Sequence, residues 1–521
     1  MQLNTLRFFK IFSALLILSF FACNSVSNKD KTNTQKPNII YILADDLGYG
    51  ELGCYGQEQI ETPNIDQLAS HGMLFTNHYA GAPVCAPSRS VLLTGKHTGH
   101  SYVRGNDEWN ERGDVWNYKA VIADSTLEGQ RPIPINTQTI GRLLQSSGYK
   151  TAAIGKWGLG APHTDGIANK QGFDYFFGYN CQRQAHTYYP VHLYENEHRV
   201  YLNNDTVAPG TLLASDADPN KEESYKPFNL NEYSGDPMFD RLSSFVSQNA
   251  GRPFFLYWAT PIPHAPIQAP KKWVDYYINK FGKEKPYDGK RGYFPHKNPR
   301  AGYAAMVSYL DEQVGLLIKQ LKDLGIYENT IIMFSSDNGA TYNGGTDSPW
   351  FNSGGVFKSE FGWGKGFLHE GGIRVPFIVS WPGQIKEGSV SDHISAFWDV
   401  LPTLCDISGT NIPEITDGIS FLPELRGEKQ LQHQFLYWEF PEYGGQLAVR
   451  IGRFKAICKN IHKSNNIHFE LYDLNADPKE LNDIANKHPD IIKKVLQIVK
   501  DEHEESWNKS WKFHQLGDTL D

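Results

Sequence analysis

The sequence predicts an α/β protein with a doubly wound, mostly parallel sheet, followed by a small C-terminal α+β subdomain with an antiparallel sheet. Along most of the chain, short apolar runs rich in β-branched and aromatic residues alternate with segments whose apolar residues recur at helical spacing. After Glu424 the pattern changes to closely spaced strand-like runs and one last helix. We therefore expect a large domain over residues 37–424 and a subdomain over 425–521.

The expected strands are nearly continuous in apolar residues, which is typical of strands buried on both faces. They cover residues 38–44, 151–154, 253–259, 330–335 and 375–381. Helices are expected between them, over residues 64–71, 139–147 and 304–324. In the last helix Leu310, Val314, Leu317 and Leu321 share one face, and Gly325 supplies a stop. Functional loops in such a sheet lie at the carboxyl ends of its strands.

The C-terminal subdomain is expected to hold the strand-like runs QFLYWEF, AVRIGRFKAIC and HFELYDL, and a helix over residues 489–504.

The N-terminus has the pattern of an export signal. Arg7 and Lys10 precede an apolar stretch over residues 11–22, which predicts a signal peptide over residues 1–22. This stretch is too short to span a bilayer. Because Ala22-Cys23 is followed by a polar run, the segment resembles a bacterial lipoprotein signal, which implies acylation of Cys23 and a tether over residues 23–36. An ordinary signal peptide with an incidental cysteine is the alternative.

These features predict an exported lipoprotein of the periplasm, outer membrane or cell surface.

The chain carries 50 basic and 58 acidic residues and no basic block, so nothing points to nucleic acid as a partner. An anionic substrate would therefore need positive charge concentrated locally.

Two acidic motifs follow expected strands directly. Asp45 and Asp46 follow the run 38–44, and Asp337 and Asn338 follow the run 330–335. Carboxylate and amide oxygens at neighbouring strand ends suit a hard divalent cation, Ca²⁺ or Mg²⁺. Helix capping or a turn is the alternative explanation for either pair.

Cys85 precedes a helical pattern in the segment PVCAPSRSVLLTGKHTGH, residues 83–100. Pro87 suits the first turn of a helix, which places Cys85 near a helix N-terminus, where anions are favoured. Arg89 lies four residues later and so on the same face. From helix chemistry alone, Cys85 could equally be a buried thiol.

The pentapeptide Cys85-Ala86-Pro87-Ser88-Arg89 matches the C-x-P-S-R signature of type I sulfatases, of the alkaline-phosphatase-like superfamily. The resemblance extends over nearly the whole mature chain, in the same order. It includes NIIYILADDLGYGELGCYG, TPNIDQLASHGMLFTNHYA, GKWGLG, PIPHAP, SSDNGA, GKGFLHEGGIRVP and FELYDLNADPKELNDIA.

The resemblance implies that Cys85 is oxidised to formylglycine by a formylglycine-generating or anaerobic sulfatase-maturing enzyme. One hydroxyl of the hydrated aldehyde would attack sulfur, and the other would allow sulfate to be expelled without attack by water. The remaining cysteines, Cys54, Cys181, Cys405 and Cys458, allow three complete pairings or none.

The resemblance also assigns roles to matching positions. A divalent cation, Ca²⁺ first and Mg²⁺ second, would be held by oxygens of Asp45, Asp46, Asp337, Asn338 and modified Cys85. Arg89 would hold the formylglycine hydroxyl and the carboxylates on the metal side. Lys156 and Lys365 would donate to sulfate oxygens, and His264 would contact sulfate and protonate the leaving alcohol.

One position departs from the family pattern. Many members read G-K-W-H-x-G, with a histidine that acts on the formylglycine hydroxyl during sulfate release, whereas this chain has Gly158 there. The base for that step is therefore unassigned. The candidates in nearby motifs are His163, His97, His100 and His186.

Residues 172–201 are crowded with Tyr and Phe and contain Arg183 and His186, which we expect to contact the substrate. Aromatic faces with interspersed hydrogen-bonding groups suit sugar rings, so a sulfated carbohydrate is the expected substrate. Packing is the alternative explanation for these aromatic residues. Two rival functions remain: a phosphonate or phosphate ester hydrolase of the same superfamily, and an inactive glycan-binding lipoprotein, which Gly158 favours.

Overall fold

A computed structural model describes residues 36–463 and 467–519. The expected signal peptide and all of the expected tether except Lys36 lie outside the described residues. Lys36–Asp521 forms one compact unit. Among the helices of the described residues, none is long and apolar enough to cross a membrane.

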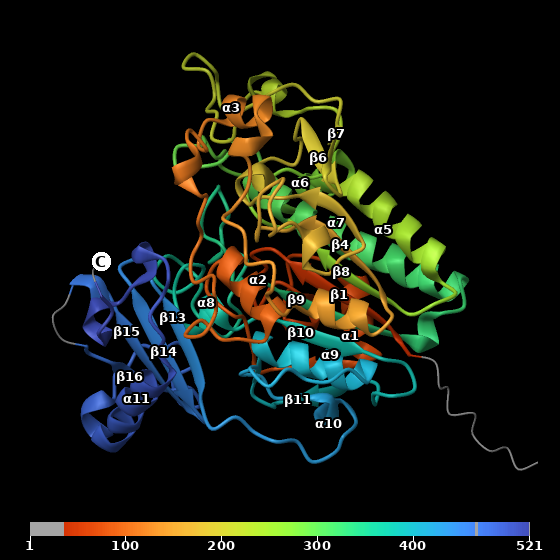
Figure 1. The fold of residues 1–521 in the computed structure, drawn as a ribbon. Coiled ribbons are helices and arrows are strands. Elements are labelled where there is room, and N and C mark those ends of the chain that lie inside the picture. Colours follow the sequence, from red (N-terminus) through yellow and green to blue (C-terminus); the bar gives the residue numbers. More distant parts are fainter. Residues whose placement is uncertain (1–35, 464–466, 520–521) are drawn as a thin grey trace, which may run out of the picture. The chain divides into compact units, whose positions relative to one another are not determined.

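A ten-stranded sheet lies at the centre of this unit, in the order β11-β2-β10-β9-β1-β8-β4-β5-β6-β7 (Figure 1). Its middle is parallel, as the alternation of strands and helices predicts. The parallel strands are β9 (Thr330–Ser336), β1 (Asn38–Ala44), β8 (Phe254–Ala259), β4 (Lys150–Lys156) and β5 (Tyr175–Tyr179). Every residue of β1, β8 and β9 is buried, which confirms strands covered on both faces.

Both edges of the sheet are mixed. The strand expected over residues 375–381 is β10 (Phe377–Ser380), and it runs antiparallel to β9 and to β2 (Met73–Phe75). β2 in turn pairs in parallel with β11 (Ser389–Ser391). At the other edge, β6 (His192–Glu195) and β7 (His198–Tyr201) form an antiparallel extension of β5.

Helices cover both faces of the sheet, as a doubly wound fold requires. Alternate residues of β1 point to opposite faces of the sheet and enter two different cores, each covered by its own group of helices. Ile40 and Ile42 belong to the core under the first group given below, and Ile39, Tyr41 and Leu43 to the core under the second. The first group is α1 (Pro63–Ser70), α5 (Gly235–Asn249), α6 (Lys271–Phe281) and α7 (Pro299–Asp323). The second group is α2 (Cys85–Thr94), α4 (Ile140–Ser146) and α9 (Val400–Ser408).

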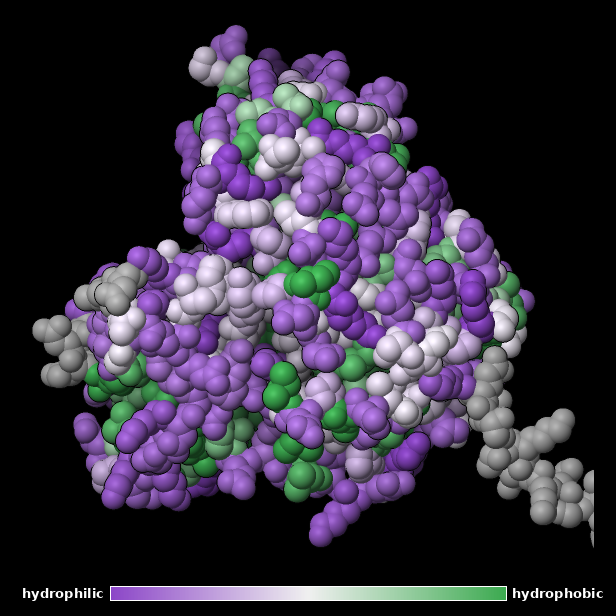
Figure 2. All heavy atoms as spheres, in the orientation of Figure 1, coloured by the Kyte–Doolittle hydropathy of each residue, from purple (hydrophilic) through white to green (hydrophobic). Residues whose placement is uncertain are grey.

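The other α-helices and strands that precede the C-terminal sheet are short. They are α3 (Tyr118–Ala123), α8 (Glu370–Ile373), α10 (Leu422–Leu425) and a two-stranded parallel pair of β3 (His78–Tyr79) and β12 (Ser395–Ala396). The face shown in Figure 2 is mainly hydrophilic, with hydrophobic residues scattered in small groups, which is ordinary for a protein surface.

The C-terminal part is the expected antiparallel sheet with a helix. Its strands follow one another in the order β13 (Leu436–Phe440), β14 (Gln446–Ile451), β15 (Phe454–Lys459) and β16 (Glu470–Asp473). Val495 and Val499 of α11 (Pro489–Glu502) pack against Tyr437 and Val449 of this sheet. The expected boundary between residues 424 and 425 stays a prediction.

A buried charge cluster joins this small sheet to the rest of the protein. Lys455 on β15 is fully buried and lies 2.8 Å from Glu370 on α8 and 3.0 Å from Glu480. Arg374 also pairs with Glu370, at 2.9 Å. Removing one partner from such a cluster leaves an uncompensated charge out of water.

We predict that Lys455→Met lowers the free energy of unfolding by about 3–5 kcal/mol, because Glu370 and Glu480 would stay buried without their shared cation. Chemical denaturation measures this change. Lys459→Met on the same strand is the matched control: Lys459 pairs with Glu470 at a half-exposed site, where such pairs contribute about 0–1 kcal/mol. Equal losses in the two variants would contradict the prediction.

Candidate active site

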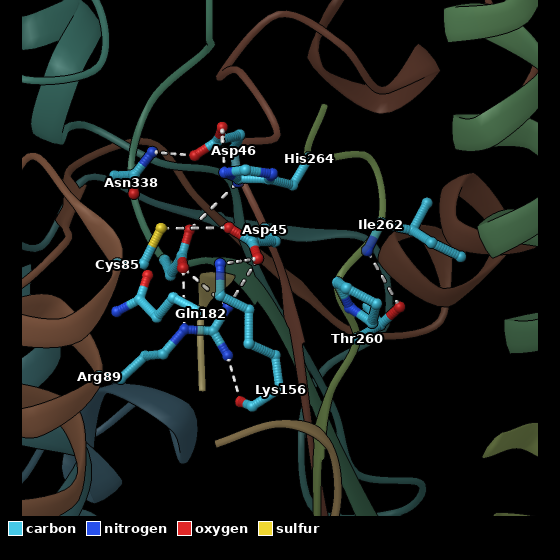
Figure 3. A network of polar contacts seen from close by, with 12 residues as sticks. Asp45, Asp46, Cys85, Arg89, Lys156, Gln182, Thr260, Ile262, His264 and Asn338 are labelled. Atoms are coloured by element: carbon cyan, nitrogen blue, oxygen red, sulfur yellow. Dashed lines mark hydrogen bonds and ion pairs between the residues drawn. The ribbon is translucent and has the colours of Figure 1, made fainter. Parts of the chain in front are cut away.

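The predicted site residues gather at the carboxyl ends of the parallel strands (Figure 3). β1 leads into Asp45 and Asp46, β9 leads into Asp337 and Asn338, and β4 ends at Lys156. All of these side chains are buried. The structure therefore brings together two acidic motifs that lie almost 300 positions apart in the sequence, as expected for neighbouring parallel strands.

Hydrogen bonds lock the two acidic motifs together. The backbone N–H of Asp46 donates to Oδ1 of Asp337 at 3.1 Å, and Nδ2 of Asn338 donates to Oδ1 of Asp46 at 2.8 Å. Asp46 has a φ of 67°, in the left-handed region that Asp tolerates better than most residues. Oδ1 of Asn338 is buried and accepts no hydrogen bond from the described residues. A buried acceptor of this kind calls for a cation or another donor.

Arg89 holds the carboxylates of both strands. It projects from α2, and its Nε and Nη2 donate to Oδ2 of Asp337 at 3.0 and 2.8 Å. Nη2 also lies 3.3 Å from Oδ2 of Asp45, and Nη1 donates to the carbonyl of Lys156 at 2.7 Å. A planar guanidinium is suited to this fixed, multiple pairing. Its contacts match the carboxylate half of the role expected for Arg89.

Cys85 is the first residue of α2 and only 1% exposed. Its Sγ lies 3.4 Å from Oδ1 of Asp45 and 3.7 Å from Nζ of Lys365. Burial and the neighbouring Asp45 carboxylate raise the pKa of the Cys85 thiol well above its usual range. The unmodified side chain is thus a neutral thiol, and a neutral thiol is a poor nucleophile.

Two lysines neutralise the aspartates beside Cys85. Nζ of Lys156 lies 2.6 Å from Oδ2 of Asp45, and Nζ of Lys365 lies 2.7 Å from Oδ1 of Asp46. Burial favours protonation of Asp45, but Lys156 and the other cations outweigh it and lower the pKa of Asp45. At Asp46 burial prevails and raises the pKa despite Lys365.

The charges around Cys85 balance. Three carboxylates face three cations: Asp45, Asp46 and Asp337 pair with Arg89, Lys156 and Lys365. A sulfate monoanion would therefore meet no net positive charge from these side chains alone. A divalent cation among these carboxylate oxygens and Oδ1 of Asn338 would supply it, so the donor set fits such an ion.

His264 completes the group. One ring nitrogen of His264 and the ligand atoms of Asp45, Asp46 and Cys85 all lie within 4.8 Å of one another. Nδ1 donates to the carbonyl of Ala265 at 2.5 Å, which leaves Nε2 as the nitrogen that lies 3.6 Å from Asp46. Burial, with Lys365 and Lys156, lowers the pKa of His264 well below its usual range.

A cavity of about 460 Å³ opens over this group. Cys85, His264, Lys365 and His186 are among its lining residues. The ring of His186 stacks on that of His264 with a centroid distance of 5.3 Å, so the expected substrate residue His186 lies beside the reacting centre. Of the four histidines considered as the base, His186 is the one that lines this cavity.

Arg183, the other expected substrate residue, is placed differently. Its guanidinium lies 4.7 Å from the ring centroid of Trp116 and donates to the carbonyl of Val115. Trp116 lines the cavity, whereas Arg183 is not among the lining residues. Substrate contact by Arg183 therefore stays a prediction.

Three of the four histidines considered for the missing base have partners elsewhere. His163 bonds to Ser125, at 3.1 Å. His97 and His100 gather around Asp417, where Nδ1 of His100 lies 2.9 Å from the carboxylate. None of these three histidines lines the cavity over Cys85.

The space beside Gly158 is filled by Gln182, which sequence reasoning did not single out for this position. A Cβ built on Gly158 would lie 3.2 Å from Cγ of Gln182. Nε2 of Gln182 donates to Oδ1 of Asn106 at 3.2 Å, and so does the backbone N–H of Ala86, next to Cys85. Gln182 lies within the aromatic-rich segment noted in the sequence, but nothing in sequence spacing pairs it with Gly158.

Comparison with known proteins identifies this arrangement. A family model described as Sulfatase matches residues 37–410. The chain belongs to the sulfatase family. Sulfate-ester hydrolysis is the activity of this family, and formylglycine and a metal ion are typical of it. A second model, described as N-sulphoglucosamine sulphohydrolase, C-terminal, matches residues 359–510 of the sulfatase.

Curated relatives extend over most of the sulfatase chain. It is 30% identical over 502 residues to "Arylsulfatase A" of Homo sapiens, covering 89% of this chain and 87% of the relative. It is 27% identical over 554 residues to "N-acetylgalactosamine-6-O-sulfatase" of Bacteroides thetaiotaomicron, covering 95% and 99%. A solved structure described as Ps i-CgsB matches with a TM-score of 0.69 and 26% identity, covering 94% of this chain and 95% of that one.

We predict that Gly158→Ala lowers turnover and stability together. Gly158 has a φ of 75°, where a Cβ costs about 1–2 kcal/mol, and that Cβ would press on Gln182. Gly325→Ala is the matched control, since Gly325 has a φ of 69° and no atom near its added Cβ. Both variants should lose similar stability, but only Gly158→Ala should lose sulfate release in a steady-state assay. Full activity of Gly158→Ala would contradict the expectation that sulfate release depends on the placement of the Gln182 side chain beside Gly158.

We predict that Asn338→Ala weakens divalent-ion binding about 10–100-fold, because it removes the unpartnered acceptor and the donor that orients Asp46. The shift of melting temperature with Ca²⁺, after chelation, measures this without an activity assay. Asn329→Ala serves as the control, since among the described residues the Asn329 side-chain amide donates to the Lys36 carbonyl alone. An unchanged Ca²⁺ titration in Asn338→Ala would exclude Asn338 as a ligand.

Proposed function

We propose that this sulfatase hydrolyses a sulfate ester of a carbohydrate, with Cys85 converted to formylglycine as its nucleophile and with Ca²⁺, or Mg²⁺ in its place, held by Asp45, Asp46, Asp337 and Asn338. The observation that carries the proposal is the position of Cys85. It is buried at a helix N-terminus, within 4.8 Å of two aspartates and a histidine.

Each missing group has one chemical task. Formylglycine would supply a hydrated aldehyde as nucleophile, and the cation would supply positive charge against the sulfate oxygens. The chain's own residues do the rest of the work. Lys156 and Lys365 carry the positive charge nearest Cys85 and are the donors proposed for the sulfate oxygens.

His264 is the proposed acid for the leaving alcohol. Its Nδ1–H is donated to a backbone carbonyl, so Nε2, on the side of Asp46, can deliver a proton only when the ring is doubly protonated. A bound sulfate anion would favour that charged form and so offset the burial and the lysines that lower the pKa of His264. Arg89 keeps Asp45 and Asp337 at fixed positions, which prevents the carboxylates from rearranging as charge develops. Gln182 cannot accept a proton as a base can, because it is an amide. We propose that it orients the group at position 85 together with Asn106.

A carbohydrate substrate is supported by the cavity and by the relatives. Trp116 and Tyr443 line the cavity and are 56% and 46% exposed, which suits stacking against a sugar ring. Relatives are named for N-acetylgalactosamine sulfates, and the Ps i-CgsB structure is also known "in complex with k-i-k-neocarrahexaose". Export, acylation of Cys23 and a maturation enzyme as partner belong to the same proposal and rest on the sequence motifs.

The rival phosphonate chemistry shares the fold. A phosphonate monoester hydrolase of Agrobacterium radiobacter matches with a TM-score of 0.60 at 19% identity, which is a likeness of fold alone. A dianionic ester would need more positive charge than a monoanion, and the three cations near Cys85 are already matched by three carboxylates. The charge balance therefore favours a sulfate ester over a dianionic phosphate ester. A phosphonate monoester is a monoanion like a sulfate ester, and against it the proposal rests on the match to the sulfatase family model.

We predict that Cys85→Ala lowers the rate of sulfate release by at least about 10³-fold, because it removes the nucleophile. The melting temperature should stay nearly unchanged, because the substitution removes only one buried sulfur atom. Sulfate release from an aryl sulfate and from a panel of sulfated sugars measures the effect. Mass spectrometry of the peptide around Cys85 should find formylglycine in the active enzyme. Full activity of Cys85→Ala, or of enzyme with an unmodified thiol, would refute the assignment.

A further inference from the structure

The cavity wall away from Cys85 is acidic, although the expected substrate is an anion. Two cations, Arg131 and Lys365, line the cavity. Four carboxylates line it as well: Asp107, Glu108, Glu111 and Glu442. A wall of this sign is unfavourable for any part of a substrate that carries negative charge.

Neither cation is free to offset the wall. Nε of Arg131 lies 2.5 Å from Asp107, and its Nη2 lies 2.6 Å from Glu111, so one guanidinium is shared by two carboxylates. Lys365 pairs with Asp46 at the reacting centre. Its charge is thus directed to the sulfate end of the cavity.

Glu108 and Glu442 lack a paired cation, although the more distant guanidinium of Arg183 partly offsets the charge of Glu108. Among the described residues, neither forms an ion pair, and each is fixed by a neutral donor to its Oε1. Nε2 of Gln130 donates to Glu108 at 2.7 Å, and the backbone N–H of Asn106 donates to Glu442 at 2.7 Å. Burial raises the pKa of each carboxyl to about 7. Each carboxyl is therefore fully ionised only above about pH 8. Its Oε2 accepts no hydrogen bond from the described residues, which leaves that oxygen for a ligand that donates hydrogen bonds.

Both carboxylates are connected to the residues beside Cys85. Asn106, whose N–H holds Glu442, accepts with its side chain from the N–H of Ala86 at 3.2 Å. Gln130, which holds Glu108, accepts from the N–H of Gln182 at 2.8 Å. The acidic wall is therefore built into the same hydrogen-bond network as the nucleophile.

A neutral sugar matches this wall. Sugar hydroxyls donate to carboxylate oxygens, and ring C–H groups stack on aromatic faces. Trp116 offers such a face, since its indole is 56% exposed and is fixed by a 2.8 Å hydrogen bond to Asn110. A second sulfate or a uronate carboxylate would instead meet Glu108 or Glu442. The cations nearby are already engaged: Arg131 pairs with two carboxylates, and Arg183 lies against the Trp116 ring and donates to the Val115 carbonyl.

We propose that Glu108, Glu442 and Trp116 form a subsite for a neutral, hydroxyl-bearing sugar, so that this enzyme removes sulfate from singly sulfated neutral sugars and rejects sugars with a second anionic group. This inference rests on the proposed function, because it takes Cys85 as the point where the sulfate ester reacts. The rejection works by electrostatic repulsion and unpaired burial of charge, a form of selection against the wrong ligand.

The test uses matured enzyme and a panel of the monosulfates of galactose, glucose and their N-acetylhexosamines, together with the matching disulfates and an aryl sulfate. We expect kcat/KM for the best monosulfate to exceed that of every disulfate containing the same ester by about tenfold or more at low salt and above about pH 8, where both carboxyls are ionised. Glu108→Gln and Glu442→Gln should each narrow this ratio by about threefold or more, through a lower KM for the disulfate. Glu61→Gln removes the same charge at a surface pair with Lys280 and should leave the ratio unchanged.

Calorimetry of the binding of the same sugars to the Cys85→Ala variant gives a second readout that needs no turnover. It should show the same preference for monosulfates over disulfates. The inference is overturned if disulfates react as well as monosulfates, if the two glutamine variants leave the ratio unchanged, or if Glu61→Gln narrows it equally. Release from the aryl sulfate and from a disulfate, but from no monosulfate, also overturns it and leaves the proposed function standing. Release from none of the compounds overturns both.

Discussion

The structure of the site depends on one constraint: several charges are buried together at the carboxyl ends of parallel strands. Taking a charge out of water costs several kcal/mol unless a partner offsets it. Asp45, Asp46 and Asp337 meet this condition through Arg89, Lys156 and Lys365, all at distances of 2.6 to 3.3 Å. Because each cation comes from a different segment, the charge balance also fixes how α2, β4 and the Lys365 loop meet the sheet.

The same constraint gives a physical reason for the proposed modification of Cys85. A thiol beside Asp45, away from water, is held neutral, so the environment that suits a bound cation and a sulfate ester makes the unmodified residue unreactive. A hydrated aldehyde would not depend on forming a thiolate there. The helix N-terminus and the lysines then act on the substrate anion rather than on the side chain at position 85.

The cavity is lined by both paired and unpaired carboxylates. Around Cys85 each carboxylate has a cation, whereas Glu108 and Glu442, which line the same cavity, form no ion pair with a described residue. In the proposed subsite, one anionic group would be bound at Cys85 with the help of the divalent cation, while other negative charge would be repelled. Specificity of this kind comes from placement of charge rather than from its total, since the net charge of −8 says nothing about either region.

The sequence by itself determined the doubly wound fold, the positions of β1 and β9 to within a residue, and the residues that gather at Cys85. These could be predicted because apolar runs and short motifs are local, and because parallel strands end at one edge of the sheet. The helix over residues 304–324 was placed five residues too short at its start, because Gly302 weakens the local helical pattern. There the chain needs a glycine, since a Cβ would lie 2.4 Å from Ile267.

Only the tertiary structure decided what stands beside Gly158, where Arg183 points, and that Glu108 and Glu442 face one cavity. Each of these depends on loops that are separate in the sequence, by tens of residues for Gly158 and Gln182 and by more than 300 for Glu108 and Glu442. Hydrophobic periodicity carries no information about such meetings, because exposed and half-buried polar side chains follow no repeat.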